Sequence, residues 1–288
     1  MNAALQSLID RYHPDTPQEW ENALREIVQE LALLGLWRSK FFEHAAFYGG
    51  TALRIFHGLP RFSEDMDFSL LKPVADFDLA PYLEAVRAEL RALGFTFEVD
   101  LKPKQITTAI DSAFIKGSTR INLLEIGAPA GLSSRFPPTQ RLKIKLEVDT
   151  DPPAGAHDEV RTLLIPIPFQ VRLYKLPSLF AGKLHATLCR NWKTRVKGRD
   201  FFDFIWYLGK RVPCHLEHLQ KRMEQTGHWK PGTKLDEAAL KERLTQRFNE
   251  VDFDQARDDV RPFVRDADAL ALWSREFFLG LVEQVKGV

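Results

Sequence analysis

The chain has 288 residues, of which 44% are hydrophobic and 27% are charged. This balance is typical of soluble globular proteins and excludes disordered, collagen-like and disulfide-rich chains. The 40 basic and 39 acidic side chains leave a formal net charge of +1, so any polyanion must bind a local basic patch. The length is near the limit for one hydrophobic core and predicts two domains, at residues 1–170 and 171–288.

Cysteine usage and the N-terminus both favour a cytoplasmic location. The two cysteines, Cys189 and Cys214, form no CxxC pair, as is usual for free thiols in a reducing compartment. The first ten residues have no basic region followed by an apolar stretch, and no uncharged run approaches the roughly 18 residues that a membrane span needs, so we expect no membrane partner. The eight histidines are scattered, so the sequence predicts no zinc site.

The first strong helix signal is a capping box at residues 16–19, where Thr is followed by Pro, Gln and Glu. Apolar side chains then recur at three- and four-residue steps and predict a helix: Leu24, Ile27, Val28, Leu31 and Leu34. A second helical segment should reach residue 45 or 46. Another helix is expected at 79–93, because Gly94 is a natural C-terminal stop.

The remaining elements divide the chain into a sheet-rich part and a helical part. Strands are expected at 95–101, 105–110, 113–116, 120–126, 143–149 and 161–165. Helices are expected at 177–192, 199–210, 214–226, 236–249 and 268–285. The predicted fold class is therefore α+β, with a mixed β-sheet core flanked by helices and followed by an all-helical C-terminal half.

The segment 61–71 combines strand alternation with carboxylates. Asp65, Asp67 and Ser69 alternate with apolar residues and should share one face of the strand. Two carboxylates on one face can bind a hard cation through oxygen, so Asp65 and Asp67 are candidate ligands of Mg²⁺ or Mn²⁺. The alternative is the solvated face of an edge strand.

A glycine-rich turn precedes these acids. Its candidate phosphate ligands are Gly49, Gly50 and Thr51, because glycines let the backbone amides approach an anion and Thr51 could cap the following helix. The alternative is a turn with a cap and no ligand. Arg61 and Ser63 lie just before the acids, so a phosphate cradle and a metal pair would stand side by side.

Residues 49–53 and 61–68 together resemble the motif of the AbiEii/AbiGii toxin family, which belongs to the nucleotidyltransferase superfamily. The resemblance extends more loosely over residues 45–208. It implies a nucleotidyltransferase core similar to that of DNA polymerase β, in which a third carboxylate on a neighbouring strand completes the metal site. Glu147 occupies the position of this acid in the motif.

The strand at 143–149 leaves two questions open. Asp149 lies on the same face as Glu147, and only motif position favours Glu147 as the third metal ligand. Lys145 could contact substrate phosphate, or it could form an ion pair with Glu147 or Asp149.

The resemblance continues in a second block, which comprises Lys183 and residues 199–203. It implies that Lys183 contacts the pyrophosphate leaving group, with a solvated helix lysine as the alternative. The residues 191–198 are an insertion relative to the family, so either Asp200 or Asp203 could be the equivalent acid. For Asp203 the alternative is a salt bridge to Arg199.

Residues 183–199 carry basic side chains and no acid, which favours a phosphate-binding surface. Within it, Trp192 could stack on a base beside Arg190 and Lys193, although core packing is the commoner fate of a lone Trp.

Taken together, these features predict a metal-dependent nucleotidyltransferase toxin that transfers a nucleotide from an NTP to an RNA, with the tRNA 3′ end favoured, or to a protein hydroxyl. Asp65, Asp67 and Glu147 would hold the metal, and Glu147 could instead accept the proton of the attacking hydroxyl. A cognate antitoxin is the expected protein partner. The alternatives are a glycosyltransferase with an Asp-x-Asp metal site and an inactive, partner-binding member of the fold.

Overall fold

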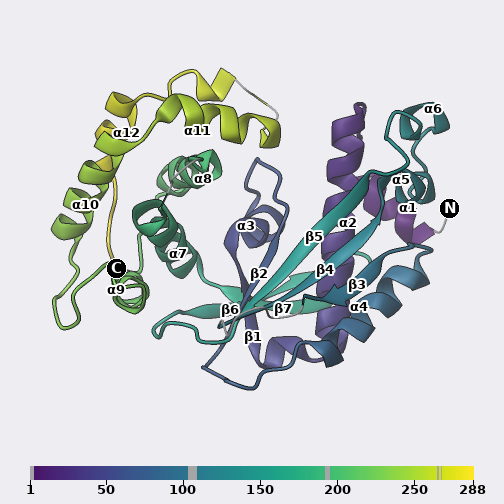
Figure 1. Ribbon diagram of the computed structural model, residues 1–288, viewed down its shortest axis with the longest axis horizontal. Coiled ribbons are helices and arrows are strands. Elements are labelled where there is room, and N and C mark those ends of the chain that lie inside the picture. The colour runs from purple at the N-terminus through teal and green to yellow at the C-terminus, as the bar shows by residue number, and fades with distance from the viewer. Residues whose placement is uncertain (1–2, 103–108, 192–194, 265, 267) are drawn as a thin grey trace. The chain divides into compact units, whose positions relative to one another are not determined.

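A computed structural model describes residues 3–102, 109–191, 195–264, 266 and 268–288 (Figure 1). The chain forms two compact units, and each contains several segments. Unit 1 comprises Met1–Thr51, Glu64–Pro152 and Val160–Leu173, and unit 2 comprises Ala52–Ser63, Pro153–Glu159 and Tyr174–Val288. These units are packing groups interleaved along the chain, and the domain division at residues 170 and 171 stays a prediction.

Unit 1 is built on a seven-stranded sheet with the order β3-β4-β5-β2-β1-β7-β6. The strands are β1 (Ala45–Tyr48), β2 (Met66–Leu70), β3 (Glu98–Leu101), β4 (Ile110–Ser118), β5 (Arg141–Asp149), β6 (Asp158–Leu163) and β7 (Phe169–Tyr174). β1 pairs antiparallel with β2, whereas β2 pairs parallel with β5 and β1 parallel with β7. The sheet is mixed, as the sequence predicts.

The helices of unit 1 follow the apolar patterns of the sequence. They are α1 (Ala3–Ile9), α2 (Pro17–Arg38), η1 (Phe41–Glu43), α4 (Ala80–Ala92), α5 (Thr119–Glu125) and α6 (Ala130–Ser133). The predicted capping box begins α2: the Thr16 hydroxyl accepts from the amide of Glu19, whose carboxylate accepts from the amide of Thr16. The predicted apolar stripe of α2 is buried.

Strand β5 divides its side chains between two environments. Leu142, Ile144, Leu146 and Val148 are buried in the core, while the polar residues between them remain partly or fully exposed. Strand β2 buries Met66 and Phe68 in the same way. The predicted alternation of β5 is therefore confirmed, and it leaves polar side chains available on one face.

Two local predictions in unit 1 are wrong. The helical segment expected to reach residue 45 or 46 stops earlier, because Ala45–Tyr48 form strand β1. Residues 119–125 form helix α5 instead of a strand, because the Ser118 hydroxyl caps it and residues Asn122, Leu123 and Ile126 are buried at helical spacing. The strand expected at 113–116 is confirmed within the longer β4, and most of the strand expected at 105–110 lies outside the described residues.

Unit 2 is helical, as predicted for the C-terminal half. Its helices are α7 (Leu176–Cys189), α8 (Gly198–Gly209), α9 (Leu216–Gln225), α10 (Glu237–Glu250), α11 (Phe253–Val260), η2 (Arg261–Phe263), η3 (Asp268–Leu270) and α12 (Arg275–Val282). Helix α3 (Gly49–His57) begins with residues of unit 1 and continues into unit 2. The core of unit 2 is aromatic and includes Phe201, Phe204, Phe248, Phe253 and Phe278.

Among the described residues, no helix is long and apolar enough to span a membrane.

Candidate active site

The sheet register brings two of the predicted acids together. In the parallel pair β2–β5, Asp67 lies directly opposite Glu147. On the other side of β2, Asp67 lies opposite Tyr48, the last residue of β1. Both acids are half-buried. Because directly opposite residues point to the same face of a sheet, the two carboxylates emerge side by side.

The glycine turn lies directly against this pair. Gly49 follows β1 and has a φ of +81°, a conformation that side chains rarely adopt. A Cβ added at Gly49 would lie 3.2 Å from both Cβ and Cγ of Asp67, and closer still to one carboxylate oxygen. The first residue of α3 and the Asp67 carboxylate therefore share one confined space, as the sequence predicts.

Thr51 occupies a different position from the one expected. Helix α3 begins at Gly49, so Thr51 lies in the first turn of the helix rather than at its cap. Its buried hydroxyl donates to the carbonyl oxygen of Asp65. The side-chain amide of Gln29 donates to the neighbouring carbonyl of Glu64 at 3.2 Å. These two bonds hold the backbone that carries Asp65 into β2.

The register separates Glu147 from Asp149. Asp149 lies opposite Ser69, which has no carboxylate, and one of its oxygens accepts from the backbone amide of Asp151 at 3.1 Å. Glu147, in contrast, stands beside Asp67. The geometry thus agrees with motif position in favouring Glu147, which is the acid directly opposite Asp67.

Lys145 forms the ion pair that the sequence left as an alternative. Its ammonium lies 2.6 Å from a Glu147 carboxylate oxygen, and the two side chains are 30% and 28% exposed. Both groups remain accessible to an incoming ligand. The contact of Lys145 with substrate phosphate stays a prediction.

These groups could hold a divalent cation and a phosphate at one place. Carboxylates such as those of Asp67 and Glu147 are the oxygen ligands that Mg²⁺ and Mn²⁺ prefer. The first amides of α3, at Gly49 and Gly50, have no partner within the helix and lie at its positive end, which is suited to an anion. The donor set therefore fits a metal-bound phosphate.

In unit 2, the second block of predicted residues forms a buried ionic network. Arg61 donates two hydrogen bonds of 2.6 Å to the carboxylate of Asp203. The Lys183 ammonium lies 2.8 Å from an oxygen of Asp203 and 2.8 Å from an oxygen of Asp200. Arg190 contacts the second oxygen of Asp200 at 2.7 Å. Sequence reasoning missed Arg190 as a member of this network.

The network keeps its charges despite burial. Burial alone would raise the pKa of Asp203, but Arg61 and Lys183 outweigh burial and lower it. Burial alone would lower the pKa of Lys183, but Asp200 and Asp203 outweigh burial and raise it. Because each buried charge has a partner, this geometry supports a positioning and stabilising role for the residues of the block.

The predicted interaction of Lys183 with pyrophosphate stays a prediction, because two carboxylates already share its ammonium. Arg199, the predicted alternative partner of Asp203, lies over the ring of Phe263 at 4.2 Å. Ser63 is buried, and its role as a ligand or a modification site stays a prediction.

The predicted basic surface is partly neutralised by acids. Besides Lys183 and Arg190, Arg195 pairs with Asp259, whose second oxygen accepts from the amide of Gly198 at 2.9 Å. Trp192 and Lys193 lie outside the described residues.

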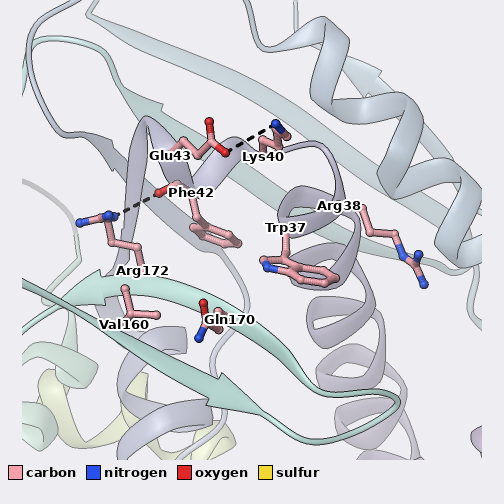
Figure 2. Close-up of a pocket in the computed structure, with 8 residues that line it drawn as sticks. All are labelled: Trp37, Arg38, Lys40, Phe42, Glu43, Val160, Gln170 and Arg172. Carbon is pink, nitrogen blue, oxygen red and sulfur yellow. Dashed lines mark hydrogen bonds and ion pairs between the residues drawn. The ribbon is translucent and has the colours of Figure 1, made fainter.

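Unit 1 also contains a cavity of about 580 Å³ that includes none of the predicted site residues (Figure 2). Its lining comes from the segments before β1 and from β6 and β7: Trp37, Arg38, Lys40, Phe42, Glu43, Val160, Gln170 and Arg172. Asp67 pairs with the last residue of β1, whereas Phe42 and Glu43 precede its first residue. The cavity is thus at the opposite end of β1 from the acids.

Comparison with known proteins identifies one family. The family model described as "Nucleotidyl transferase AbiEii toxin, Type IV TA system" matches residues 31–279. No curated protein matches the chain. Two similar solved structures come from Helicobacter pylori. One, of a candidate nucleotidyltransferase, has a TM-score of 0.47 and 20% identity, and the alignment covers 90% of this chain and 92% of that one. The other, of JHP933, has a TM-score of 0.47 and 19% identity, with 90% of each chain covered.

Substitution of Asp203 tests the stabilising role of the buried network. In Asp203→Asn, two buried cations lose a carboxylate, so we expect the free energy of unfolding to fall by about 3 to 5 kcal/mol. The matched control is Asp254→Asn, whose carboxylate is 82% exposed and pairs with Arg257. There the change should stay below about 1 kcal/mol. Urea denaturation measures the free energy of unfolding of both variants. If both lose the same amount of stability, the buried network does not have the proposed stabilising role.

The lowered pKa of Asp203 also predicts a pH dependence. Between the ordinary carboxyl pKa of about 4 and the lower value in the folded chain, only the unfolded chain takes up a proton. The stabilisation is therefore complete above that range and is lost as the pH falls through it. Urea titrations at several pH values below about 5 should show a steeper loss in the wild type than in Asp203→Asn. If the free energy of unfolding falls equally with pH in wild type and in Asp203→Asn, the lowered pKa of Asp203 does not account for the pH dependence.

Proposed function

Because the chain belongs to the AbiEii family of nucleotidyl transferase toxins of type IV toxin–antitoxin systems, we propose that it transfers a nucleotide from an NTP to an RNA hydroxyl. Membership of this family identifies the chain as a nucleotidyltransferase of the toxin class. The identity of the acceptor, the metal and the residues that act are the parts that we propose.

The observation that carries this proposal is that Asp67 lies against the glycine turn at Gly49 and directly opposite Glu147 in the sheet. A nucleotidyltransferase needs a cation and the triphosphate at one place, and here the turn amides and the paired carboxylates meet. An inactive, partner-binding protein has no need of this arrangement. The match to a nucleotidyltransferase family likewise favours this reaction over glycosyl transfer.

In the proposed site, Asp65, Asp67 and Glu147 hold Mg²⁺ or Mn²⁺. The bound metal would orient the triphosphate and offset the charge that develops during transfer. The amides of Gly49 and Gly50 bind phosphate oxygens, and Thr51 positions Asp65 through its carbonyl.

The transfer exchanges the phosphoanhydride bond between the α- and β-phosphates of the NTP for a phosphodiester bond to the acceptor. The acceptor hydroxyl attacks the α-phosphorus of the NTP, the bond from that phosphorus to the bridging oxygen breaks, and pyrophosphate leaves with the electron pair. Glu147 either completes the metal site or accepts the hydroxyl proton. The Lys145 ammonium lies 2.6 Å from a Glu147 carboxylate oxygen and supplies a positive charge beside it.

We favour RNA as the acceptor because residues 183–199 carry a run of basic side chains and no acid, even though Lys183, Arg190 and Arg195 pair with acids elsewhere in the chain. The tRNA 3′ end is the specific candidate. A protein hydroxyl is the second possible acceptor. The family description, a type IV toxin–antitoxin toxin, supports a cognate antitoxin as the partner.

Incorporation of labelled nucleotide tests the reaction and its metal ligand. The protein is incubated with total RNA, Mg²⁺ and each labelled NTP in turn, and label in RNA and in protein is counted separately. We expect Asp67→Asn to lose about 100-fold or more of the activity, because it removes a charge that holds the metal. The matched control, Asp149→Asn on β5, should keep most of it. Absence of label from both acceptors in wild type would refute the transfer.

Substitution of Gly49 tests the shared space. In Gly49→Ala the new methyl group meets the Asp67 carboxylate and the backbone is strained, so the acid must move. A displacement of about 1 Å can lower the rate by about 100-fold. The control is Gly131→Ala in α6, where an added Cβ meets nothing within 4 Å. Circular dichroism verifies folding, and full activity in folded Gly49→Ala would exclude a confined site.

A further inference from the structure

Three soft or borderline metal-binding side chains converge in unit 2. His185, Cys189 and His228 each place one ligand atom within 4.8 Å of the other two. We call them the His–Cys–His cluster. His185 and Cys189 lie one turn apart on the same face of α7, and His228 follows the end of α9, which packs against α7. None of the three is among the residues of the proposed transfer reaction.

A threonine holds both histidines of the cluster. The Thr226 hydroxyl oxygen lies 2.9 Å from Nε2 of His185 and 3.0 Å from Nδ1 of His228. The same hydroxyl donates to the carbonyl oxygen of Arg222 at 3.0 Å. Its single proton is therefore used, so the hydroxyl oxygen can accept an N–H group from each ring in the tautomers that carry the proton on Nε2 of His185 and Nδ1 of His228. In each neutral imidazole, the other nitrogen then carries a lone pair.

This arrangement resembles the outer shell of known metal sites. A histidine that binds a metal usually donates its second ring N–H to a fixed acceptor, which sets the orientation of the ring. Here one threonine is that acceptor for two rings. The turn that carries His228 is itself held, because the His228 amide donates to the carbonyl of Met223 at 2.8 Å.

We propose that the His–Cys–His cluster binds one Zn²⁺ ion, with water as the fourth ligand. Thiolate sulfur and imidazole nitrogen select zinc and similar transition metals over Mg²⁺, which prefers oxygen. In tetrahedral zinc sites, bonds of about 2.0 to 2.3 Å place the ligand atoms roughly 3.3 to 3.7 Å apart. The cluster needs to close by only about 1 Å, and the exposed side chain of His228 permits such movement.

The surroundings explain how the site would be loaded. Burial raises the pKa of the Cys189 thiol to about 11, against the opposing effect of Arg243, Arg247 and Arg222. Because zinc binds the thiolate form of cysteine, zinc binding would release the thiol proton. The bound ion would join the loop after α9 to helix α7, so zinc would stabilise unit 2.

Zinc affinity is measured by competition with a chromophoric chelator after the full chain has been stripped with EDTA. We expect one tight equivalent in wild type. Cys189→Ser and His228→Gln should each bind at least tenfold more weakly, because even loss of an outer-shell partner weakens metal sites by about 10- to 100-fold. His44→Gln, at an exposed histidine outside the cluster, is the matched control.

Positioning by Thr226 is tested with Thr226→Val, which keeps all three ligands. Its zinc affinity should fall by about 10- to 100-fold, while the affinity of the control variant stays unchanged. If Thr226→Val binds zinc as tightly as wild type does, Thr226 does not position the ligands of the site.

Protection of the thiol gives a second readout, independent of affinity and of transfer activity. Alkylation of Cys189, followed by mass spectrometry, should become at least tenfold slower when Zn²⁺ is added and should recover with EDTA. Buried Cys214 is the internal reference for unfolding. If zinc binds equally to wild type, folded Cys189→Ser and folded His228→Gln, or leaves the alkylation rate of Cys189 unchanged, the proposal is overturned.

Discussion

The absence of a side chain at Gly49 is the constraint on which the candidate active site depends. The strand-to-helix turn has a positive φ, and the space a Cβ would occupy belongs to the carboxylate of Asp67. Only glycine meets both conditions without strain. In the proposed site, this close approach would let backbone amides and a carboxylate bind one ligand, a metal-bound phosphate. Strands β1 and β2 position the two sides of this space because they are direct neighbours in the sheet.

The register of β2 and β5 adds the second acid. A parallel pairing places Glu147 beside Asp67, and a slip of one residue would turn Glu147 into the core. The buried residues of β5 oppose such a slip, because Leu146 and Val148 would then face solvent. The hydrophobic core of unit 1 thus stabilises the arrangement of its charged groups. The stability of unit 1 and the placement of its acids both depend on the alternation of apolar and polar residues along β5.

Unit 2 uses charge in a different way. Asp203 is fully buried and holds Arg61, which is distant in sequence, while Lys183 joins Asp203 to Asp200. A motif of lysine, arginine and aspartate can therefore be a structural network as well as a set of ligands. Substitution of any one of these residues would lower the free energy of unfolding, because a buried charged partner would be left uncompensated.

Much of the fold and part of the site could be predicted from sequence, because the relevant signals are local. The capping box at Thr16 and the alternation of β5 involve residues that are close in the chain. Local signals also misled: residues 119–125 alternate well enough to resemble a strand, but Ser118 caps them as a helix. Periodicity over so few residues does not distinguish the two structures.

The sequence alone determined the α+β class, the glycine turn that precedes the acids at residues 65 and 67, and the family resemblance. Only the tertiary structure decided that Glu147 rather than Asp149 stands beside Asp67, that Arg61 pairs with Asp203, and that His228 meets Cys189. The physical reason is the distance along the chain. Local geometry is set by backbone conformation and side-chain spacing, whereas these contacts depend on strand register and helix packing, which bring remote residues together.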